Sequence, residues 1–512
     1  MKLPDAISAI PGITVEAWND LTPSAQAIIL AIVGHYERRI AAYEQRCAAY
    51  EERISAYEEQ RVVYEKRIAE LEDRLKRNPS NSSMPPSSDI FKKHRKKHKP
   101  SGKPPGRSPG HPGEMRALVP LEEVDAVHDH SPVRCEHCGD PLVDDDAAGP
   151  LERHQVSELP PITPTITEHQ ACDRRCKKCG KVSKGAIPAT ARRSAFGPRA
   201  HAVASILSGR CRVSRRDVAE CFEQIFGLPI CPASVQNMLE SVGDALGSAY
   251  DEALEAARAA QVRYIDETSW PVSGKRGWLW VCVTAQATVF TIASGRGKIV
   301  LIEWIGLAAL ALGYVVSDRY AVYNLIEMIR RGICHAHLKR DFTKIGDLGG
   351  PTCTLGPALS SVHHEIFALW HRFISGEIHR PDFEAQLAPL RRAMRTLLED
   401  GTRHPHRKIA GICTDILRHG EAMWNFAVIE GMEPTNNAAE RALRPAVIWR
   451  KVSSGTRSEA GSRFVERMLT VVATCKQNLV NFYDYITRVV EADFQGHPPP
   501  KLLPAPPLAI AA

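Results

Sequence analysis

Residues 36–77 consist of six consecutive units of seven residues, and this repeat constrains the fold more than any other feature. Tyrosine or leucine opens every unit, and the fifth position is apolar in all units except at Arg61. The resulting stripe has a spacing of about 3.5 residues, as in the seam of a coiled coil. Arginine and glutamate flank the stripe so that they would face each other in a parallel pair. The repeat therefore predicts a parallel homodimer; one long helix lying on its own domain is the alternative.

The segment after the repeat cannot continue the helix, because residues 78–89 are rich in Pro, Ser and Asn. Residues 91–116 contain nine Lys and Arg against one Glu, interspersed with Pro and Gly. This composition predicts a disordered basic linker, residues 78–118, that neutralises DNA phosphates without reading base sequence. A linker that only increases solubility is the alternative. The residues expected to contact DNA are Lys92, Lys93, Arg95, Lys96, Lys97 and Arg107.

Two CxxC pairs, each followed by glycine, predict a zinc-binding module in residues 119–190. Four thiolates can hold one structural Zn²⁺ in tetrahedral geometry. The interval between the pairs is longer than in usual zinc ribbons, Cys172 and His137 are alternative ligands, and a coincidental arrangement of cysteines is the other reading. The expected ligands are Cys135, Cys138, Cys176 and Cys179.

Residues 213–242 have the pattern of a helix, a turn around Gly227 and Pro229, and a second helix. This pattern predicts a helix-turn-helix-like DNA-binding region within residues 191–257, although a helical pair without a DNA-binding role has the same periodicity. No apolar run approaches the length of about 18 residues that a membrane span requires. Fourteen scattered cysteines fit a reducing compartment, so we expect a cytoplasmic, nucleoid-associated protein without membrane contact.

Three carboxylates further along the chain form a candidate metal site. Asp266 and Asp318 each end a short β-rich run, and adjacent strands would bring them together. Carboxylates that converge repel each other unless a cation lies between them, and oxygen ligands favour Mg²⁺ or Mn²⁺. Two such ions can catalyse phosphoryl displacement. Asn436 and Asn437 could begin a helix whose first turn carries the third carboxylate, Glu440.

Several nearby residues complete this expectation. The strand alternation places Glu267 on the face opposite Asp266, so it is excluded from the site. Glu430 and Glu433 are the rivals of Glu440 for the third ligand position. The cations expected to contact DNA phosphates on or near the same helix are Arg441, Arg444, Arg450 and Lys451.

The order of two strand aspartates and a helix glutamate is that of the ribonuclease-H-like nucleotidyl transferases. The chain also contains the motifs NPSNSSMPPSSD, GRSPGHPG, YIDETSW, VSDRYAVYN, CHAHLKRDF and EPTNNAAERALRPAVIWRK. With the paired CxxC motifs, these resemble the DDE transposases of the insertion sequence 66 family over nearly the whole chain. The resemblance implies a catalytic triad of Asp266, Asp318 and Glu440, with His337 and Arg340 in a supporting motif. Two departures are Thr435, where many relatives have Asp, and CHAH in place of Cys-Trp-Ala-His, which could remove an aromatic partner beside the site.

The expected fold is multidomain α+β, with a ribonuclease-H-like catalytic core that contains an all-α insertion. A coiled coil, a zinc-ribbon-like module and helix-turn-helix-like helices precede the core. The expected boundaries are 1–35, an N-terminal helical segment; 36–77, the coiled coil; 78–118, the linker; 119–190, the zinc module; 191–257, the helical region; 258–490, the catalytic domain, with its insertion at about 350–425; and 491–512, a Pro-rich tail whose residues 497–512 are expected to be disordered.

The expected function is DNA transposition with two Mg²⁺ or Mn²⁺ ions and a structural Zn²⁺. The expected partners are the terminal inverted repeats of the element, target DNA, a second copy of the chain and helper proteins of the same element. The alternatives are a catalytically decayed DNA-binding zinc protein and a ribonuclease-H-like nuclease that does not join strands.

Overall fold

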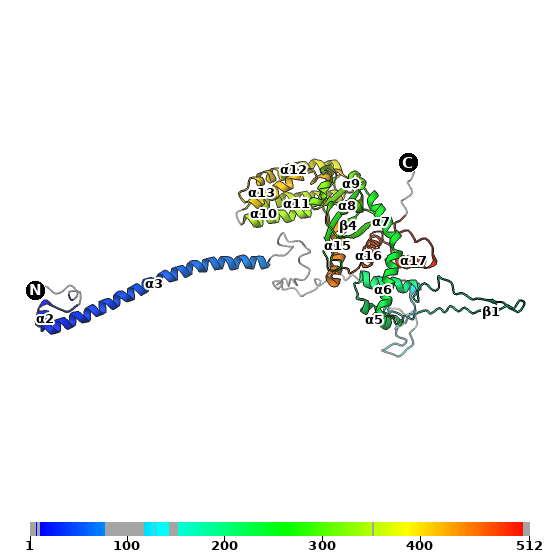
Figure 1. Ribbon diagram of the computed structural model, residues 1–512, viewed down its shortest axis with the longest axis horizontal. Coiled ribbons are helices and arrows are strands. Elements are labelled where there is room, and N and C mark those ends of the chain that lie inside the picture. Colours follow the sequence, from blue (N-terminus) through cyan, green and yellow to red (C-terminus); the bar gives the residue numbers. More distant parts are fainter. Residues whose placement is uncertain are drawn as a thin grey trace. The chain divides into compact units, whose positions relative to one another are not determined.

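The computed structural model describes residues 7, 11–76, 117–128, 130–142, 152–350 and 353–504. The chain divides into two compact units, Met1–Ile90 and Phe91–Ala512. The second unit combines helices with a five-stranded mixed sheet, so the chain is a multidomain α+β protein (Figure 1). Among the described helices, none is both long enough and apolar enough to cross a membrane.

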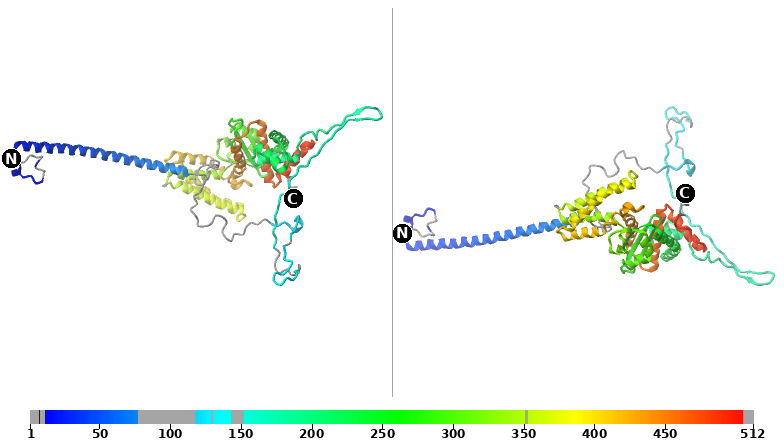
Figure 2. Two further views of the ribbon diagram at one scale, coloured as in Figure 1. Left: turned by 90° about the horizontal axis from the view of Figure 1, so that it is seen from below. Right: turned by 90° about the horizontal axis from the view of Figure 1, so that it is seen from above.

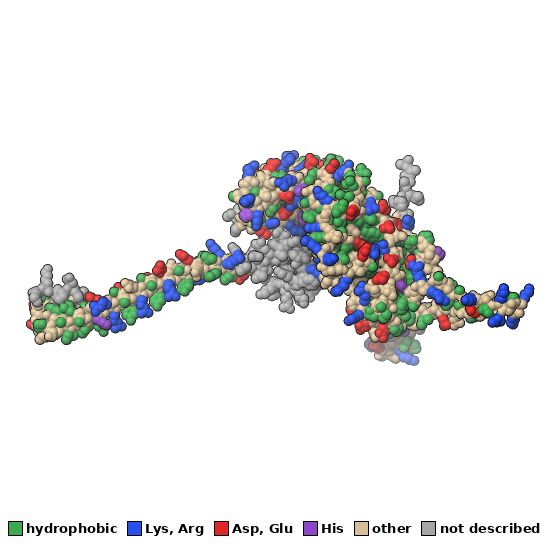
Figure 3. Space-filling view, in the orientation of Figure 1, with side chains coloured by type: hydrophobic (Ala, Val, Ile, Leu, Met, Phe, Trp, Pro, Cys, Tyr) green, Lys and Arg blue, Asp and Glu red, His purple; other side chains and the backbone are tan. Residues whose placement is uncertain are grey.

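The first unit contains the short helix α2 (Val15–Asn19) and the long helix α3 (Pro23–Lys76). A single helix runs through the described part of the repeat, as the predicted coiled coil requires, but α3 begins at Pro23, inside the segment expected to be separate. Hydrophobic side chains are exposed along its length (Figure 3); Tyr36, for example, is 56% exposed. An apolar stripe of this kind is what a second helix would cover. Pairing in a coiled coil remains a prediction.

The described residues between 117 and 190 are mostly exposed, and none of them is fully buried. They include the 3₁₀ turn η2 (Leu121–Glu123) and the antiparallel pair of β1 (Arg174–Arg175) and β2 (Val182–Ser183). Figure 2 shows β1 and β2 near the tip of a long two-stranded extension. The second CxxC pair, Cys176 and Cys179, lies in the turn between these strands.

A bundle of short helices follows. Ser214 caps α5 by accepting a hydrogen bond from the backbone of Asp217, and Gly227 ends it with a positive φ of 60°. Pro232 occupies the first turn of α6, where its missing N–H costs nothing. The helix, turn and helix are therefore confirmed as local structure. The elements are α4 (Pro198–Ser205), the π-helical η4 (Ile206–Arg210), α5 (Arg215–Phe226), α6 (Pro232–Ala245) and α7 (Gly247–Ala259).

The surroundings of α6 bear on the prediction that this pair binds DNA. α6 packs against α4 and against α16 (Glu459–Gln477), and it buries Val235, Met238 and Val242. Its sequence contains Glu240 and Asp244 but no Lys or Arg. A helix that enters the DNA groove needs an exposed face and is usually basic. DNA binding by α5 and α6 therefore remains a prediction, and the composition of α6 does not support it.

The sheet of the second unit has the strand order β5-β4-β3-β6-β7. The first three strands are antiparallel, whereas β6 and β7 run parallel to β3 and to each other. Aromatic and β-branched residues fill these strands, as a buried sheet requires. The strands are β3 (Val262–Ser269), β4 (Trp278–Val283), β5 (Thr288–Ala293), β6 (Tyr314–Ser317) and β7 (Arg331–Ile333).

Helix α16 covers the free edge of β5. At intervals of four residues, its side chains satisfy the backbone N–H groups that an edge strand leaves unpaired. Thr474 Oγ1 accepts from the Thr288 N–H at 3.1 Å, and Thr470 Oγ1 accepts from the Phe290 N–H at 3.0 Å. Glu466 Oε1 accepts from the Ile292 N–H at 2.5 Å. These bonds fix the position of α16 relative to the sheet.

The all-α insertion predicted near residues 350–425 is helical. Its helices contact one another in sequence order and lie side by side in Figures 1 and 2. The preceding helix, α10, also packs against two of them, so the insertion is continuous with the region after β7. The helices are α10 (His335–Gly349), α11 (Leu355–Ile374), α12 (Arg380–Thr402), α13 (Arg407–Arg418) and α14 (Asn425–Val428).

The remaining elements connect and close the core. They are α8 (Lys298–Ile305), α9 (Leu307–Leu312), the 3₁₀ turns η5 (Ala321–Leu325) and η6 (Met328–Arg330), α15 (Asn437–Ser453) and α17 (Phe482–Gln495). The expectation of disorder over residues 497–512 is wrong for their first part. Leu502 is buried, and its N–H donates to Glu252 at 2.9 Å. The apolar residues between the prolines make this part of the tail pack.

Candidate active site

Asp266 and Asp318 both lie just beyond the residues that pair β3 with β6. This parallel pairing ends with Tyr264 opposite Val316; Asp266 lies two residues further along β3, and Asp318 directly follows Ser317, the last residue of β6. The two aspartates are close enough for the charge of Asp318 to act on Asp266. Asp266 itself is not at a strand end as predicted, because β3 continues to Ser269 by pairing with β4. What ends at this point is the parallel half of the sheet.

Several groups hold Asp318 in place. Its Oδ1 accepts from the backbone N–H of Tyr320 at 2.8 Å. Its carbonyl oxygen accepts from Arg331 Nη2 at 2.9 Å, and Arg331 is fully buried. Burial lowers the pKa of Arg331 to about 10, and the charge of Asp318 opposes this shift. Arg331 therefore stays protonated near neutral pH and supports the turn that carries the carboxylate.

Glu440 reaches the site because α15 begins beside β3. As predicted, the helix begins at Asn437, with Asn436 at the N-cap position and Glu440 in the first turn. The Asn436 side chain does not cap the helix: its Nδ2 donates to the carbonyl of Ile265 at 2.8 Å. Its backbone N–H donates to Cys334 Sγ at 3.1 Å. Asn436 therefore ties the start of α15 to the strand residue immediately before Asp266.

The first turns of α10 bring the supporting motif to the same place. Arg340 Nη2 donates to Glu440 Oε1 at 2.9 Å, and His337 Nδ1 lies 3.7 Å from the same oxygen. Burial and the charge of Arg340 lower the pKa of His337, while Glu440 and Asp318 oppose this shift. Cys334, His337 and Glu440 also have potential ligand atoms within 4.8 Å of one another, the one such group of His, Cys, Asp or Glu found among the described residues.

The electrostatics of Asp266 connect the three carboxylates. Burial raises the pKa of Asp266 well above its usual value, and the negative charges of Glu267, Asp318 and Glu440 raise it further. The site thus contains more negative charge than the neighbouring protein cations balance. Asn436 Oδ1 and His337 Nδ1 are also buried, and neither has a hydrogen-bond partner in the described part of the chain. Excess negative charge, oxygen donors and unpartnered polar atoms fit a hydrated divalent cation.

Sequence reasoning excluded Glu267, and the structure shows a different use for it. Glu267 is the neighbour of Asp266 within β3, and its side chain is almost completely buried. Arg296 forms an ion pair with it at 2.5 Å, and Tyr323 Oη donates to it at 2.6 Å. The Arg296 guanidinium also stacks on Tyr320 at 3.8 Å from the ring centroid. This network supports the strand and the turn that carry the aspartates.

The cations predicted to contact DNA fall into different environments. Arg441 and Arg444 are exposed on α15. Arg450 instead holds α15 to the end of β3, donating to Thr268 Oγ1 at 3.0 Å and to Ser269 Oγ at 2.6 Å. Lys451 lies in the last turn of α15. The predicted contacts in the basic linker, Lys92, Lys93, Arg95, Lys96, Lys97 and Arg107, lie outside the described residues.

The two CxxC pairs adopt similar turns. The Gly139 N–H donates to the Cys135 carbonyl at 2.9 Å, and the Gly180 N–H donates to the Cys176 carbonyl at 2.9 Å. Backbone N–H groups within each turn lower the pKa values of the Cys135 and Cys176 thiols. Among the described residues, however, no ligand cluster unites these cysteines with Cys138 and Cys179. A shared zinc site remains a prediction.

His335 occupies the position at which the resemblance leads us to expect tryptophan. Its ring is buried at 1% exposure and packs against His363, Phe367, Trp424 and Phe426. Burial lowers the pKa of His335 to about 4. The substitution therefore does not leave an aromatic gap, because the neutral imidazole fills it.

Two family models match separate parts of the chain. A family model described as "Transposase IS66 family" matches residues 204–463, about half of the sequence and all three carboxylates. A second model, for a family of unknown function, matches residues 19–117. "Uncharacterized protein y4qI" from Sinorhizobium fredii (strain NBRC 101917 / NGR234) is 25% identical over 307 residues. The match covers 53% of this chain and 55% of that relative, so the chain spans about half the length of the curated relative.

Proposed function

This chain belongs to the transposase IS66 family, and from that premise we propose that it catalyses metal-dependent cleavage and joining of DNA strands. The proposed catalytic centre consists of Asp266, Asp318 and Glu440. The observation that supports it most strongly is the pairing of β3 with β6, which ends just before both aspartates, together with the Asn436 tether that brings Glu440 beside them. The sheet order and the helical insertion are consistent with a ribonuclease-H-like core.

In the proposed reaction, water first attacks a phosphate at the element end, breaking the P–O bond to the 3′ oxygen. The freed 3′-hydroxyl then attacks a target phosphate and displaces the target's own 3′ oxygen. Divalent cations, Mg²⁺ or Mn²⁺, bound by the three carboxylates would polarise the phosphate and stabilise the developing charge. Arg340 keeps Glu440 oriented, and the Tyr320 N–H keeps Asp318 oriented. No covalent enzyme intermediate is required.

DNA, including the terminal repeats and the target, is the proposed substrate. The described cations nearest to Glu440 in sequence are Arg441 and Arg444, and both are exposed to a ligand. Exposed arginines bind phosphate oxygens through paired N–H donors. The basic linker would add contacts that do not depend on base sequence. These contacts would hold the strand, and the carboxylates would act on it.

The test is an assay of the full-length chain on supercoiled plasmid carrying the DNA that flanks its gene. We expect Mg²⁺-dependent cuts at the element ends and joined products at new positions, both absent with Asp318→Asn. DNA binding by Asp318→Asn should persist. Cuts without joined products would instead support a nuclease, and binding without any cuts in wild type would support a decayed DNA-binding protein.

We also propose that α3 pairs in parallel with α3 of a second copy. The exposed stripe includes Tyr36, Tyr43, Ile54 and Tyr57, each more than half exposed in the single chain. Burying an apolar stripe of this length can stabilise a dimer. Cysteine crosslinking at Cys47, with reduced monomer as control, should yield dimer. A monomer by light scattering of the full chain at high concentration would contradict the pairing.

A structural Zn²⁺ bound by Cys135, Cys138, Cys176 and Cys179 is a separate proposal. It is supported by the two matching turns and by the N–H groups that stabilise thiolates in each. Metal analysis of the purified protein should find one zinc per chain, and Cys176→Ser should lose it. Full zinc retention in that variant would show that the ligand assignment is wrong.

A further inference from the structure

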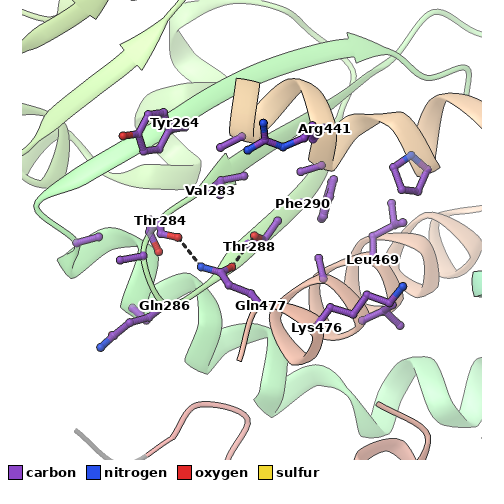
Figure 4. A pocket seen from close by; sticks show the side chains of 18 of the residues that line it. Tyr264, Val283, Thr284, Gln286, Thr288, Phe290, Arg441, Leu469, Lys476 and Gln477 are labelled. Carbon is purple, nitrogen blue, oxygen red and sulfur yellow. Dashed lines mark hydrogen bonds between the residues drawn. The ribbon is translucent and has the colours of Figure 1, made fainter. Parts of the chain in front are cut away.

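A cavity of about 980 Å³ lies between α15, α16 and the turn that joins β4 to β5 (Figure 4). Its α15 lining includes Ala438, Arg441 and Ala442, which share one flank of the helix. Neither Glu440 nor either catalytic aspartate lines it. The cavity is therefore a second concave site, separate from the carboxylates, and it is large enough for a nucleotide-sized ligand.

The walls of this cavity are fixed by hydrogen bonds. Gln477 Nε2 donates to the Thr284 carbonyl at 2.6 Å, and Thr288 Oγ1 donates to Gln477 Oε1 at 2.9 Å. Figure 4 shows the side chain of Gln477, the last residue of α16, reaching toward Thr284 and Thr288. Apolar side chains such as Leu469 and Phe290 also line the cavity. The cavity thus has fixed polar walls and apolar sections, as sites for ligands with both a charged and an apolar part do.

Four cations line the cavity: Arg210, Arg212, Arg441 and Lys476. Among the described residues, no ion pair joins any of them to an acid. Burial lowers the pKa of Lys476, and the nearby charge of Arg210 lowers it further, so two like charges lie close together. Cations gathered in this way repel one another unless an anion lies between them.

Two acidic residues also line the cavity, but they belong to its other end. Glu433 lies beside Tyr264, whose hydroxyl accepts from the Glu433 N–H at 2.8 Å, and Glu430 precedes it in the same loop. Figure 4 shows Tyr264 and Lys476 on opposite sides of the cavity. The charge is therefore divided, with the cationic end formed by Arg210 and Lys476.

We propose that this cavity binds a phosphate-bearing nucleotide of an unpaired DNA strand, with Arg210 and Lys476 at the phosphate. An unpaired strand fits better than a duplex, because only a splayed nucleotide can enter a cavity whose walls are partly apolar. The inference rests on the proposed function in that it takes DNA as the ligand. It adds a strand-binding site that the carboxylate centre does not require for its own chemistry.

The test measures binding of a fluorescein-labelled oligodeoxythymidine of about 12 nucleotides to the full-length chain by anisotropy. EDTA is present, so catalysis plays no part. Arg210→Gln and Lys476→Gln should each weaken binding and reduce the slope of log K against log salt by about 0.7. The matched control is Arg463→Gln on the same helix α16, where Arg463 pairs with Glu459 at 2.5 Å outside the cavity. If Arg210→Gln and Lys476→Gln both have the same salt slope as wild type and as Arg463→Gln, the inference is overturned.

A second variant tests the cavity rather than the surface charge. Ala473→Phe fills the cavity from α16 without changing charge, and Ala442→Leu does so from α15 if the first variant does not fold. Either should weaken oligonucleotide binding several-fold, with the fold checked by circular dichroism. Wild-type affinity in the filled, folded variant would mean that the cations act only as surface charge, which overturns the nucleotide site.

Two further results separate the possible ligands and proposals. Free thymidine monophosphate should compete only weakly with the oligonucleotide, and competition at equal concentration would assign the cavity to free nucleotides instead. If wild type binds neither the oligonucleotide nor duplex DNA, the proposed function itself fails. If wild type binds DNA and the cavity variants match it, only the further inference fails.

Discussion

The two flanks of α15 have opposite electrostatic character. On one flank, Glu440 lies beside Asp266 and Asp318, where burial and then the neighbouring negative charges raise the pKa of Asp266. On the other flank, Arg441 joins Arg210 and Lys476 around a cavity in which no described acid pairs with them. Glu440 and Arg441 are adjacent in sequence, so the helical rotation between neighbouring residues separates the two regions.

This difference indicates how one helix can serve both parts of a reaction on DNA. An anionic site requires cations, and a cationic site requires anions, so each flank is incomplete without a ligand of the opposite charge. In the proposed reaction, metal ions would bind the carboxylates, and DNA phosphates would bind the arginines and the lysine. The variants below test whether cleavage, which depends on the carboxylate flank, and DNA binding, which depends on the cationic flank, can be lost separately.

The largest expected effect is on the carboxylate flank. Asp266→Asn keeps the size of the side chain but removes a charge that the cation site requires. We expect strand cleavage to fall about 1,000-fold, equivalent to about 4 kcal/mol. Affinity for DNA in EDTA should remain within about twofold of wild type, since Asp266 repels phosphates rather than binding them. Parallel loss of DNA binding would show that the two flanks are not independent.

A smaller effect is expected from the residue that orients Glu440. Arg340→Gln removes the charged donor at 2.9 Å but leaves the carboxylate in place. Cleavage should fall about tenfold, and the affinity for Mn²⁺ should change as well, because the carboxylate is less well positioned. Arg340→Lys should restore part of the loss. If the glutamine variant binds Mn²⁺ and cleaves like wild type, Arg340 has only a structural role.

How far the sequence anticipates this site depends on the range of the interactions involved. The heptads, the helix that begins at Asn437 and the order of the three carboxylates follow from local patterns. The full length of β3 does not, because β4 extends it beyond Asp266 by long-range pairing. The Glu267–Arg296 pair and the cavity likewise depend on elements distant in sequence. The ordered part of the tail could not be predicted because prolines indicate disorder, while Leu502 is held by Glu252.

The exposed arginines of α15, Arg441 on the cavity flank and Arg444 one helical turn after Glu440, should respond mainly through salt dependence. Arg441→Gln and Arg444→Gln each remove one exposed cation from α15. For duplex DNA, removing one cation that binds a phosphate should reduce the slope of log K against log salt by about 0.9. Affinity at low salt should fall a few-fold, with cleavage at saturating DNA retained. An unchanged slope for both variants would exclude these arginines from the DNA interface.

A further effect, on stability rather than on cleavage or DNA binding, separates the pH dependence of the helical insertion from that of the α15 flanks. Burial lowers the pKa of His363 to about 3, whereas an unfolded histidine titrates near 6.5. The unfolded state therefore binds more protons as pH falls, and stability decreases between about pH 7 and pH 4. At pH 5, His363 should account for about 2 kcal/mol of this loss.

His363→Phe should remove that part of the acid sensitivity, since Phe can stack on Phe367 in the same way. The measurement is chemical denaturation of both proteins at pH 7 and pH 5. An equal loss of stability in the variant would place the acid sensitivity elsewhere, for example at His335, whose pKa burial lowers to about 4.

The most direct test of the carboxylate centre compares Glu440→Gln with Glu433→Gln. Both variants replace a carboxylate by an amide of the same size, but Glu440 lies beside Asp266 and Asp318, whereas Glu433 lines the cavity. Mn²⁺ binding to the full-length protein is measured by electron paramagnetic resonance, together with cleavage of the plasmid substrate. The account predicts that Glu440→Gln loses Mn²⁺ binding and cleavage, while Glu433→Gln retains both. Normal Mn²⁺ binding and cleavage by Glu440→Gln, with loss of both in Glu433→Gln, would contradict it.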